Sequence, residues 1–207
     1  MARTGRPRTF DRDEAVRKAM LLFWEHGYES TSLTQLKAEM GDLSAASFYA
    51  AFTSKEALFK EVVEQYVGSY GQATAPLRDE TLDGRTAIEL ALRGSARMQT
   101  DRKHPLGCLL VQSANTCSPE NIHIQRLLAR ERGRTRTAMQ KCVERAIRAG
   151  DLPQSTDVTA LASVFDTFLF GVTPQARDGV SLATLEKAIG IVMRSWDDAA
   201  AGIARLH

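Results

Sequence analysis

The sequence predicts an all-α protein, and three observations support this fold class. Apolar residues recur at the three- and four-residue spacing of an α-helix through most of the 207 residues. Serine or threonine stands in front of several such segments, where helix N-caps are expected. No segment shows a sustained period-two alternation with β-branched residues, so we expect no strands.

Composition narrows the class of protein further. The chain has 43% hydrophobic and 25% charged residues, which is typical of a soluble globular protein. Its longest apolar run, 161–172, is interrupted by Asp166 and is shorter than the ~18 residues of a membrane span. The basic N-terminus lacks the apolar core of a signal peptide. We therefore expect a cytoplasmic protein that does not contact membranes.

Residues 1–10 form a basic arm. Arg3, Arg6 and Arg8 lie in the first eight residues without an acidic neighbour, although the net charge of the whole chain is only +2. We expect the arm to be flexible without a partner, because it has no apolar residues around Arg6. It is either a solvated tail or an arm that enters the minor groove of DNA, where arginine suits the narrow, electronegative floor.

Two helices are predicted next. The first covers residues 11–26 and ends at Gly27. The second begins at Ser32, and Gln35 lies three residues on as the partner in a capping box. The apolar stripe of the first helix consists of Ala15, Val16, Ala19, Met20, Leu22 and Phe23.

A tight turn and a third helix follow. Gly41 and Asp42 supply the turn, and Ser44 caps a helix that runs to about Ala51. Two short helices on either side of a tight turn are typical of a helix-turn-helix. That motif presents its second helix to the major groove of DNA.

A fourth helix is expected from about Ser54, where Thr53 and Glu56 have the spacing of another capping box. We place the domain boundary there, with a DNA-binding domain at 1–53 and a larger helical domain at 54–207. In the larger domain, the spacing of apolar residues predicts helices at 81–100, 106–116, 118–150, 156–171 and 181–201. The third of these begins with Ser and Pro and ends at a glycine, as long helices commonly do.

The N-terminal residues of the third helix are the candidates for contact with base edges. They are Ser44, Ala45, Ala46 and Ser47. None of them is Arg, Lys, Asn or Gln, so we expect modest direct readout, with DNA shape, the arm and dimer spacing contributing more. The candidates for phosphate contacts are Thr31, Ser32, Thr34, Tyr49 and Lys55. Arg6 and Arg8 of the arm are candidates for DNA contact in the minor groove. Alternatively, Tyr49 is a partly buried core residue and Lys55 an exposed charge.

Residues 10–66 resemble the DNA-binding domain of the TetR (tetracycline-repressor) family of bacterial regulators. The resemblance lies in FDRDEAVRKAMLLFWEHGYESTSL, which begins at Phe10, and in SFYAAFTSKEALFK, which begins at Ser47. By this resemblance Ser32, Thr34, Ser44, Tyr49 and Lys55 occupy positions similar to those of the family's DNA contacts.

The second half is similar to one ligand-binding branch of the same family. The similar segments are GCLLV at 107–111, RAIRAGDL at 145–152 and GVTPQARDGV at 171–180. The resemblance implies a homodimer formed by the last two helices, at about 156–201. It also implies a small-molecule pocket in the larger domain, but it does not identify the effector.

Candidate pocket residues come from the apolar segments of the larger domain. They are Cys108, Gln112, Phe165, Asp166 and Phe168. One hypothesis is that Cys108 or Cys117 senses oxidants or electrophiles. The alternative is that these cysteines are small buried hydrophobes, which is the commoner role of a free cysteine. Likewise, the phenylalanines are core or interface residues in the alternative interpretation.

Asp166 interrupts an apolar helix, and a buried carboxylate needs a partner. It pairs across a dimer, pairs with an arginine of the preceding long helix, or faces a cationic ligand.

Other functional classes have weaker support. A thiol enzyme using Cys108 and His104 is one alternative, and a helical protein-interaction adaptor is another. Against the enzyme, the sequence has no G-x-S-x-G, Walker or dinucleotide motif. His104 and His123 have no companion residues at metal-ligand spacing, so we expect neither a metal nor a cofactor. We therefore predict a regulator that binds double-stranded DNA, as a repressor released by a small-molecule effector or alternatively as an activator.

Overall fold

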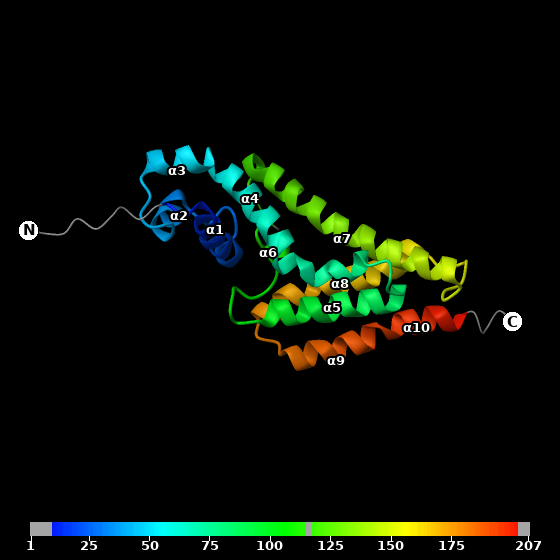
Figure 1. Ribbon diagram of the computed structural model, residues 1–207. Helices are drawn as coiled ribbons and strands as arrows, with labels where there is room; N and C mark the ends of the chain where they lie inside the picture. The colour runs from blue at the N-terminus through cyan, green and yellow to red at the C-terminus, as the bar shows by residue number, and fades with distance from the viewer. Residues whose placement is uncertain (1–9, 115–116, 203–207) are drawn as a thin grey trace, which may run out of the picture.

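The computed structural model describes residues 10–114 and 117–202, and every regular element in these ranges is a helix (Figure 1). The all-α prediction is therefore confirmed. One end of the molecule consists of α1 (Arg12–His26), α2 (Leu33–Glu39), α3 (Ala45–Phe52) and α4 (Lys55–Gly68). The rest consists of η1 (Tyr70–Arg78), α5 (Gly84–Thr100), α6 (Leu109–Gln112), η2 (Pro119–Asn121), α7 (Ile122–Ala149), α8 (Val158–Arg177), α9 (Leu182–Val192) and α10 (Arg194–Ala201).

Side-chain caps set the starts of the first helices. The Asp11 carboxylate accepts the Glu14 N–H at 3.0 Å and begins α1. Helix α1 ends at Gly27, whose φ of 83° is strained for residues with a side chain. The capping box of α2 is present as predicted: Ser32 Oγ accepts the Gln35 N–H, and Gln35 Oε1 accepts the Ser32 N–H.

The turn between α2 and α3 uses the two residues that the sequence indicates. Gly41 and Asp42 both have positive φ, at 93° and 58°. Ser44 Oγ then accepts the Ser47 N–H at 3.0 Å and caps α3. The helix-turn-helix is thus held by local backbone conformation and by its caps.

The predicted cap of the fourth helix was wrong by one residue. Ser54, not Thr53, caps α4, because Ser54 Oγ accepts the Ala57 N–H at 3.0 Å. Thr53 has a φ of 61° and ends α3 instead. Both residues have a capping hydroxyl, and the chain reversal after α3 determines which of them reaches the next helix.

Several helices in the larger part differ from the prediction. Helix α5 begins at Gly84 and not at residue 81, and the predicted helix 118–150 is the short 3₁₀ helix η2 followed by α7. The 106–116 helix is only the four residues of α6, and α8 passes its predicted end at residue 171 and continues through Pro174 to Arg177. The predicted helix 181–201 is two helices that meet at Met193. The Trp196 N–H donates to the carbonyl of Met193 three residues earlier, which is the tighter pattern of a 3₁₀ turn.

Two hydrophobic cores fill the molecule. The first is built from α1–α4 and also takes in Leu109 and the start of α7 through Ile124 and Leu128. The second lies among α5 and α7–α10. Gly84 brings α5 close to α7, since a Cβ at this position would lie 2.3 Å from the carbonyl oxygen of Cys142. Among the described residues, no helix is both long and apolar enough to cross a membrane.

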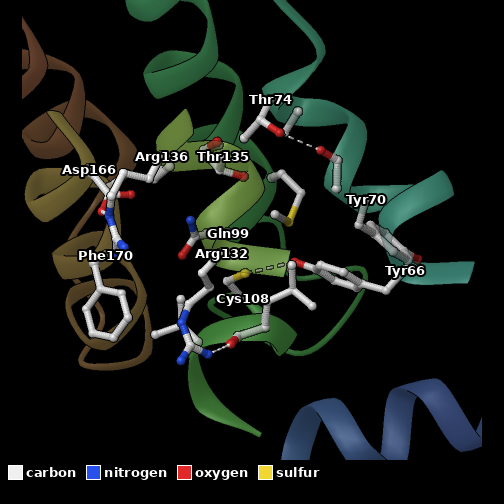
Figure 2. A pocket seen from close by; sticks show the side chains of 17 residues that line it. Tyr66, Tyr70, Thr74, Gln99, Cys108, Arg132, Thr135, Arg136, Asp166 and Phe170 are labelled. Carbon is white, nitrogen blue, oxygen red and sulfur yellow. Dashed lines mark hydrogen bonds and ion pairs between the residues drawn. The ribbon is translucent and has the colours of Figure 1, made fainter. Parts of the chain in front are cut away.

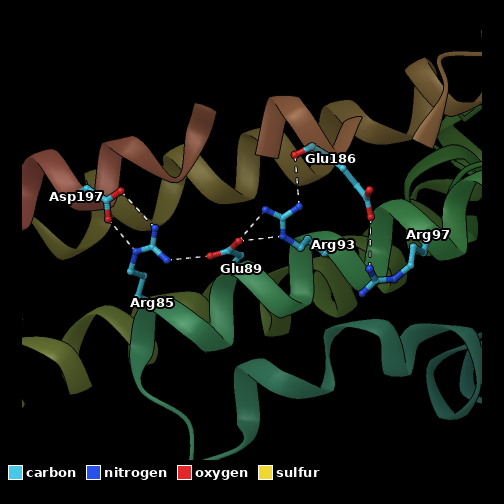
Figure 3. A network of polar contacts seen from close by, with 6 residues as sticks. All are labelled: Arg85, Glu89, Arg93, Arg97, Glu186 and Asp197. Atoms are coloured by element: carbon cyan, nitrogen blue, oxygen red, sulfur yellow. Dashed lines mark hydrogen bonds and ion pairs between the residues drawn. The ribbon is translucent and has the colours of Figure 1, made fainter. Parts of the chain in front are cut away.

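A row of ion pairs joins α5 to α9 and α10 (Figure 3). Arg85 Nε lies 2.8 Å from Asp197, and Arg97 Nη1 lies 3.4 Å from Glu186. Glu89 lies between Arg85 and Arg93 and bonds both. These side chains are partly exposed, so each pair adds little stability, and the row mainly fixes how the three helices align.

Candidate nucleic-acid interface and internal pocket

Helix α3 has one buried face and one exposed face. Phe48 and Phe52 are buried at 0% and 2% exposure, and their ring centroids lie 5.5 Å apart. The opposite face is exposed and carries only small side chains and one aromatic ring. Its residues are Ser44, Ala45, Ala46, Ser47, Tyr49 and Ala50. A short helix with this arrangement has a free surface that fits a groove.

The polar atoms of this face are partly engaged. Ser44 Oγ lies 2.9 Å from Ser47 Oγ and also accepts the Ser47 N–H. Each hydroxyl still has capacity for another partner. Tyr49 is 49% exposed, with its ring edge-on to Phe48 at 5.5 Å. The Tyr49 side chain is therefore positioned by the core while it reaches solvent.

The remaining predicted contact residues are placed differently from one another. Ser32 and Thr34 are exposed at the start of α2. Thr31 is fully buried and its hydroxyl donates to the Gly27 carbonyl at 2.7 Å, so no side-chain atom of Thr31 faces solvent. Lys55 is half-buried, and its ammonium lies 4.4 Å from the centroid of the Tyr28 ring. Burial lowers the pKa of Lys55. Arg6 and Arg8 lie outside the described residues.

A pocket of about 80 Å³ lies between the two ends of the molecule, where α4, η1, α5, α6, α7 and α8 converge (Figure 2). We call it the internal pocket. Its polar lining consists of Tyr66, Tyr70, Thr74, Ser95, Gln99, Cys108, Arg132, Thr135, Arg136 and Asp166. Its apolar lining includes Met98, Leu110, Val111, Leu169 and Phe170. A concave site with an apolar wall and a few polar groups is typical of small-molecule sites.

Cys108 forms part of one wall and accepts a hydrogen bond from the Tyr66 hydroxyl at 3.3 Å (Figure 2). Burial raises the pKa of the Cys108 thiol, while the bond from Tyr66 and the positive charge of Arg132 act against that rise. Burial also raises the pKa of Tyr66 well above its ordinary value. Both groups are therefore neutral at physiological pH.

The charged residues of the pocket come from α7 and α8. Arg136 Nε donates to Asp166 at 2.7 Å, so of the three alternatives for Asp166 the structure shows the pairing with an arginine of the preceding long helix. Arg132 Nη1 donates to the Leu110 carbonyl at 2.5 Å, and its guanidinium carbon lies 5.9 Å from the centroid of the Phe170 ring. Partial burial lowers the pKa of Arg132 because the charged form loses hydration.

Two of the five predicted pocket residues line the pocket, namely Cys108 and Asp166. Gln112 instead donates to the Trp24 carbonyl at 2.5 Å, and Phe165 is fully buried beside Trp196. Phe168 packs against the second core. The residues that surround Cys108 and Asp166 in the pocket were not predicted from the sequence. Arg132, Thr135 and Arg136 on α7, and Asp166, Leu169 and Phe170 on α8, share the i, i+3, i+4 spacing of one helix face.

Trp24 connects the pocket wall to α1. Its ring centroid lies 4.9 Å from those of both Tyr66 and Tyr70, which line the pocket. On another side it stacks on His104 at 4.6 Å. A displacement of either tyrosine would therefore push on Trp24 and shift α1 together with the helices that pack against α1. Within the described ranges, no cluster of histidine, cysteine or carboxylate side chains could hold a metal ion.

Two segments match known family profiles. Residues 16–62 match the profile described as "Bacterial regulatory proteins, tetR family". Residues 85–190 match the profile described as "Tetracyclin repressor-like, C-terminal domain".

Full-length relatives agree with these matches. The chain is 36% identical over 196 residues to the HTH-type transcriptional repressor ComR of Escherichia coli, covering 94% of this chain and 92% of ComR. It is 28% identical over 184 residues to the repressor BdcR of the same organism, covering 87% and 86%. Among solved structures, a cysteine mutant of the TetR family regulator CifR, complexed with 26-bp operator DNA, has a TM-score of 0.85 and 37% identity, covering 92% of this chain and all of that one.

Proposed function

The chain belongs to the TetR family of bacterial regulatory proteins and is a DNA-binding transcriptional regulator, and we propose that it is a homodimeric repressor controlled by a small molecule in the internal pocket. The name of ComR and the operator complex of CifR support repression and operator binding. A thiol enzyme is set aside because the family and the relatives are regulators. DNA as the partner is in keeping with a cytoplasmic location.

The observation that carries the DNA-binding part of this proposal is the exposed face of α3. A domain at 1–53 would place Ser44, Ala45, Ala46 and Ser47 against base edges, with alanine methyl groups suited to the methyl group of thymine. Ser32, Thr34 and Tyr49 flank that face and would contact the phosphate backbone. Lys55 would join them after leaving the Tyr28 ring.

The dimer would form through α8, α9 and α10. Large apolar side chains remain exposed on these helices, including Val164 at 39% and Ile191 at 59%. A dimer would cover them and place two copies of α3 about one DNA turn apart, or a multiple of it. This interface covers the range 156–201 that the sequence predicts.

A ligand in the internal pocket would control DNA binding through the aromatic residues that surround it. A ligand that displaces Tyr66 or Tyr70 acts on Trp24, and through Trp24 on α1. The ligand shifts the population only if it prefers the arrangement in which the two α3 helices no longer match the groove spacing. Release from the operator is then the expected response.

We expect Tyr49→Ala to weaken operator binding about tenfold or more, because one hydrogen bond to the charged backbone is lost at each half-site. Fluorescence anisotropy with duplexes from either side of the gene measures this, across a salt series and with an unrelated duplex as reference. Leu90→Ala, which alters a large side chain that is 40% exposed on α5, is the control and should bind as the parent does. Equal affinity of the Tyr49→Ala protein and the parent for the preferred duplex would remove Tyr49 from the interface.

Cys108 supports a second mode of control, in which the thiol reacts with an electrophile. An adduct on Cys108 Sγ has little room in the pocket and would displace Tyr66. Because burial raises the pKa of the thiol, the reaction should be slow at pH 7 and faster at higher pH.

We therefore expect N-ethylmaleimide to release the parent from its operator and to leave the Cys108→Ser protein bound. Cys117→Ser, which alters a cysteine outside the pocket, should respond as the parent does. Cysteine mutants of the similar regulator CifR form complexes with operator DNA. We likewise expect Cys108→Ser to keep its affinity for DNA. Equal release of Cys108→Ser and the parent would exclude this mode.

A further inference from the structure

The internal pocket carries more positive than negative charge. Its lining has two arginines and one aspartate, which leaves a net charge of +1, while Cys108 and Tyr66 stay neutral. Asp166 is already engaged by Arg136 at 2.7 Å. Arg132 has no carboxylate within ion-pair distance in the described part of the chain. A half-buried guanidinium of this kind is stabilised by an anion.

The free donors of Arg132 are well defined. Of its guanidinium nitrogens, Nη1 is held by the Leu110 carbonyl, which fixes the plane of the group. Among the described residues, Nε and Nη2 have no hydrogen-bond partner. Arginine binds a carboxylate through two parallel N–H groups, so this orientation suits a bidentate contact.

Gln99 supplies a second donor from α5. It is 3% exposed and lines the pocket, and its Oε1 accepts the Thr173 hydroxyl at 2.7 Å. That bond fixes the amide, and Nε2 has no acceptor within the described ranges. Gln99 and Arg132 are both drawn among the side chains that line the pocket in Figure 2. The Nε2 amide is therefore free to donate to an oxygen of a ligand in the pocket.

The volume and the apolar wall restrict the rest of the ligand. The pocket holds about 80 Å³, roughly half of the ~150 Å³ of an engineered cavity that binds benzene. Leu110, Val111 and Leu169 line it alongside the polar groups. An inorganic anion would leave this wall without a partner, whereas a short alkyl chain would cover it.

We propose that the internal pocket binds a short-chain monocarboxylate of about two to four carbons, with its carboxylate held by Arg132 and Gln99 and its alkyl chain against Val111 and Leu169. This inference rests on the proposed function only in treating the pocket as the effector site. Binding itself can be measured on the free protein, without DNA.

The test is calorimetric titration of the full-length protein with propanoate, propanamide and inorganic phosphate. We expect propanoate to bind at least about tenfold more tightly than its neutral isostere, because a charge-assisted bond is lost in the amide. Affinity should fall from butanoate to hexanoate as the chain outgrows the pocket. Arg132→Met should weaken propanoate binding about tenfold or more, and Arg132→Lys should restore part of it.

Arg130→Gln is the matched control, since Arg130 lies on the same helix, is exposed and does not line the pocket. It should bind propanoate as the parent does, and circular dichroism confirms that each variant is folded. Three results would overturn the proposal. Propanoate and propanamide would bind equally well, Arg132→Met would bind propanoate as the parent does, or the parent would not bind propanoate. Tighter binding of phosphate than of any carboxylate would also overturn it, in favour of an inorganic anion site. Operator binding of the parent, measured separately and without a carboxylate, tests the proposed function independently of ligand binding.

Discussion

Replacing Phe48 with alanine is expected to lower the free energy of unfolding of the α1–α4 end by about 3–5 kcal/mol. Phe48 is fully buried, and with Phe52 it attaches α3 to the first core. Helix α3 has only eight residues, and a helix of this length is not stable in water without tertiary contacts. The loss of the ring should therefore release the helix that we propose enters the groove, and operator binding should be lost with it.

Urea unfolding followed by circular dichroism, at one fixed protein concentration, measures the change in stability. Tyr49→Ala is the comparison, because Tyr49 is the next residue on α3 and is exposed. It should lose affinity for DNA while it keeps the stability of the parent. If the Phe48→Ala protein unfolds at the same urea concentration as the parent, Phe48 does not anchor α3.

Local signals explain why the helix-turn-helix could be predicted from the sequence. The capping box of Ser32 and Gln35 and the turn at Gly41 and Asp42 depend on residues within four positions of one another. The break at Met193 could not be predicted in this way. Met193 is 1% exposed and lies in the second core. The break between α9 and α10 is therefore associated with packing against other helices, and no local sequence pattern marks it.

The same contrast applies to the candidate site. The exposed face of α3 follows from one helix and its caps. The internal pocket requires α4, η1, α5, α6, α7 and α8 to meet, and no local pattern shows which faces of these helices converge. Asp166 was found because a charge in an apolar helix stands out. Arg132 was missed because it is one of many basic residues on α7.

Replacing Trp24 with alanine is expected to lower the free energy of unfolding of the α1–α4 end by about 3–5 kcal/mol. The two ends of the molecule should then unfold in two separate transitions. Trp24 is fully buried in α1, and its ring packs on Tyr66, Tyr70 and His104 at centroid distances of 4.6–4.9 Å. Tyr66 belongs to the first core together with Trp24, Tyr70 packs against that core, and both tyrosines also line the pocket. Without the ring, the α1–α4 end should unfold at a lower urea concentration than the second core.

The chain has two tryptophans, so each replacement leaves one fluorescent reporter. In the Trp24→Ala protein, Trp196 reports the second core, where it packs on Phe165 at 6.2 Å. Its fluorescence transition should stay near that of the parent, while circular dichroism shows an earlier loss of helix. Trp196→Ala is the reciprocal control and should weaken the second core first. Coincident transitions in the Trp24→Ala protein by both measurements would mean that other contacts join the two cores. Trp24 would then not be the link through which a ligand in the pocket acts on α1.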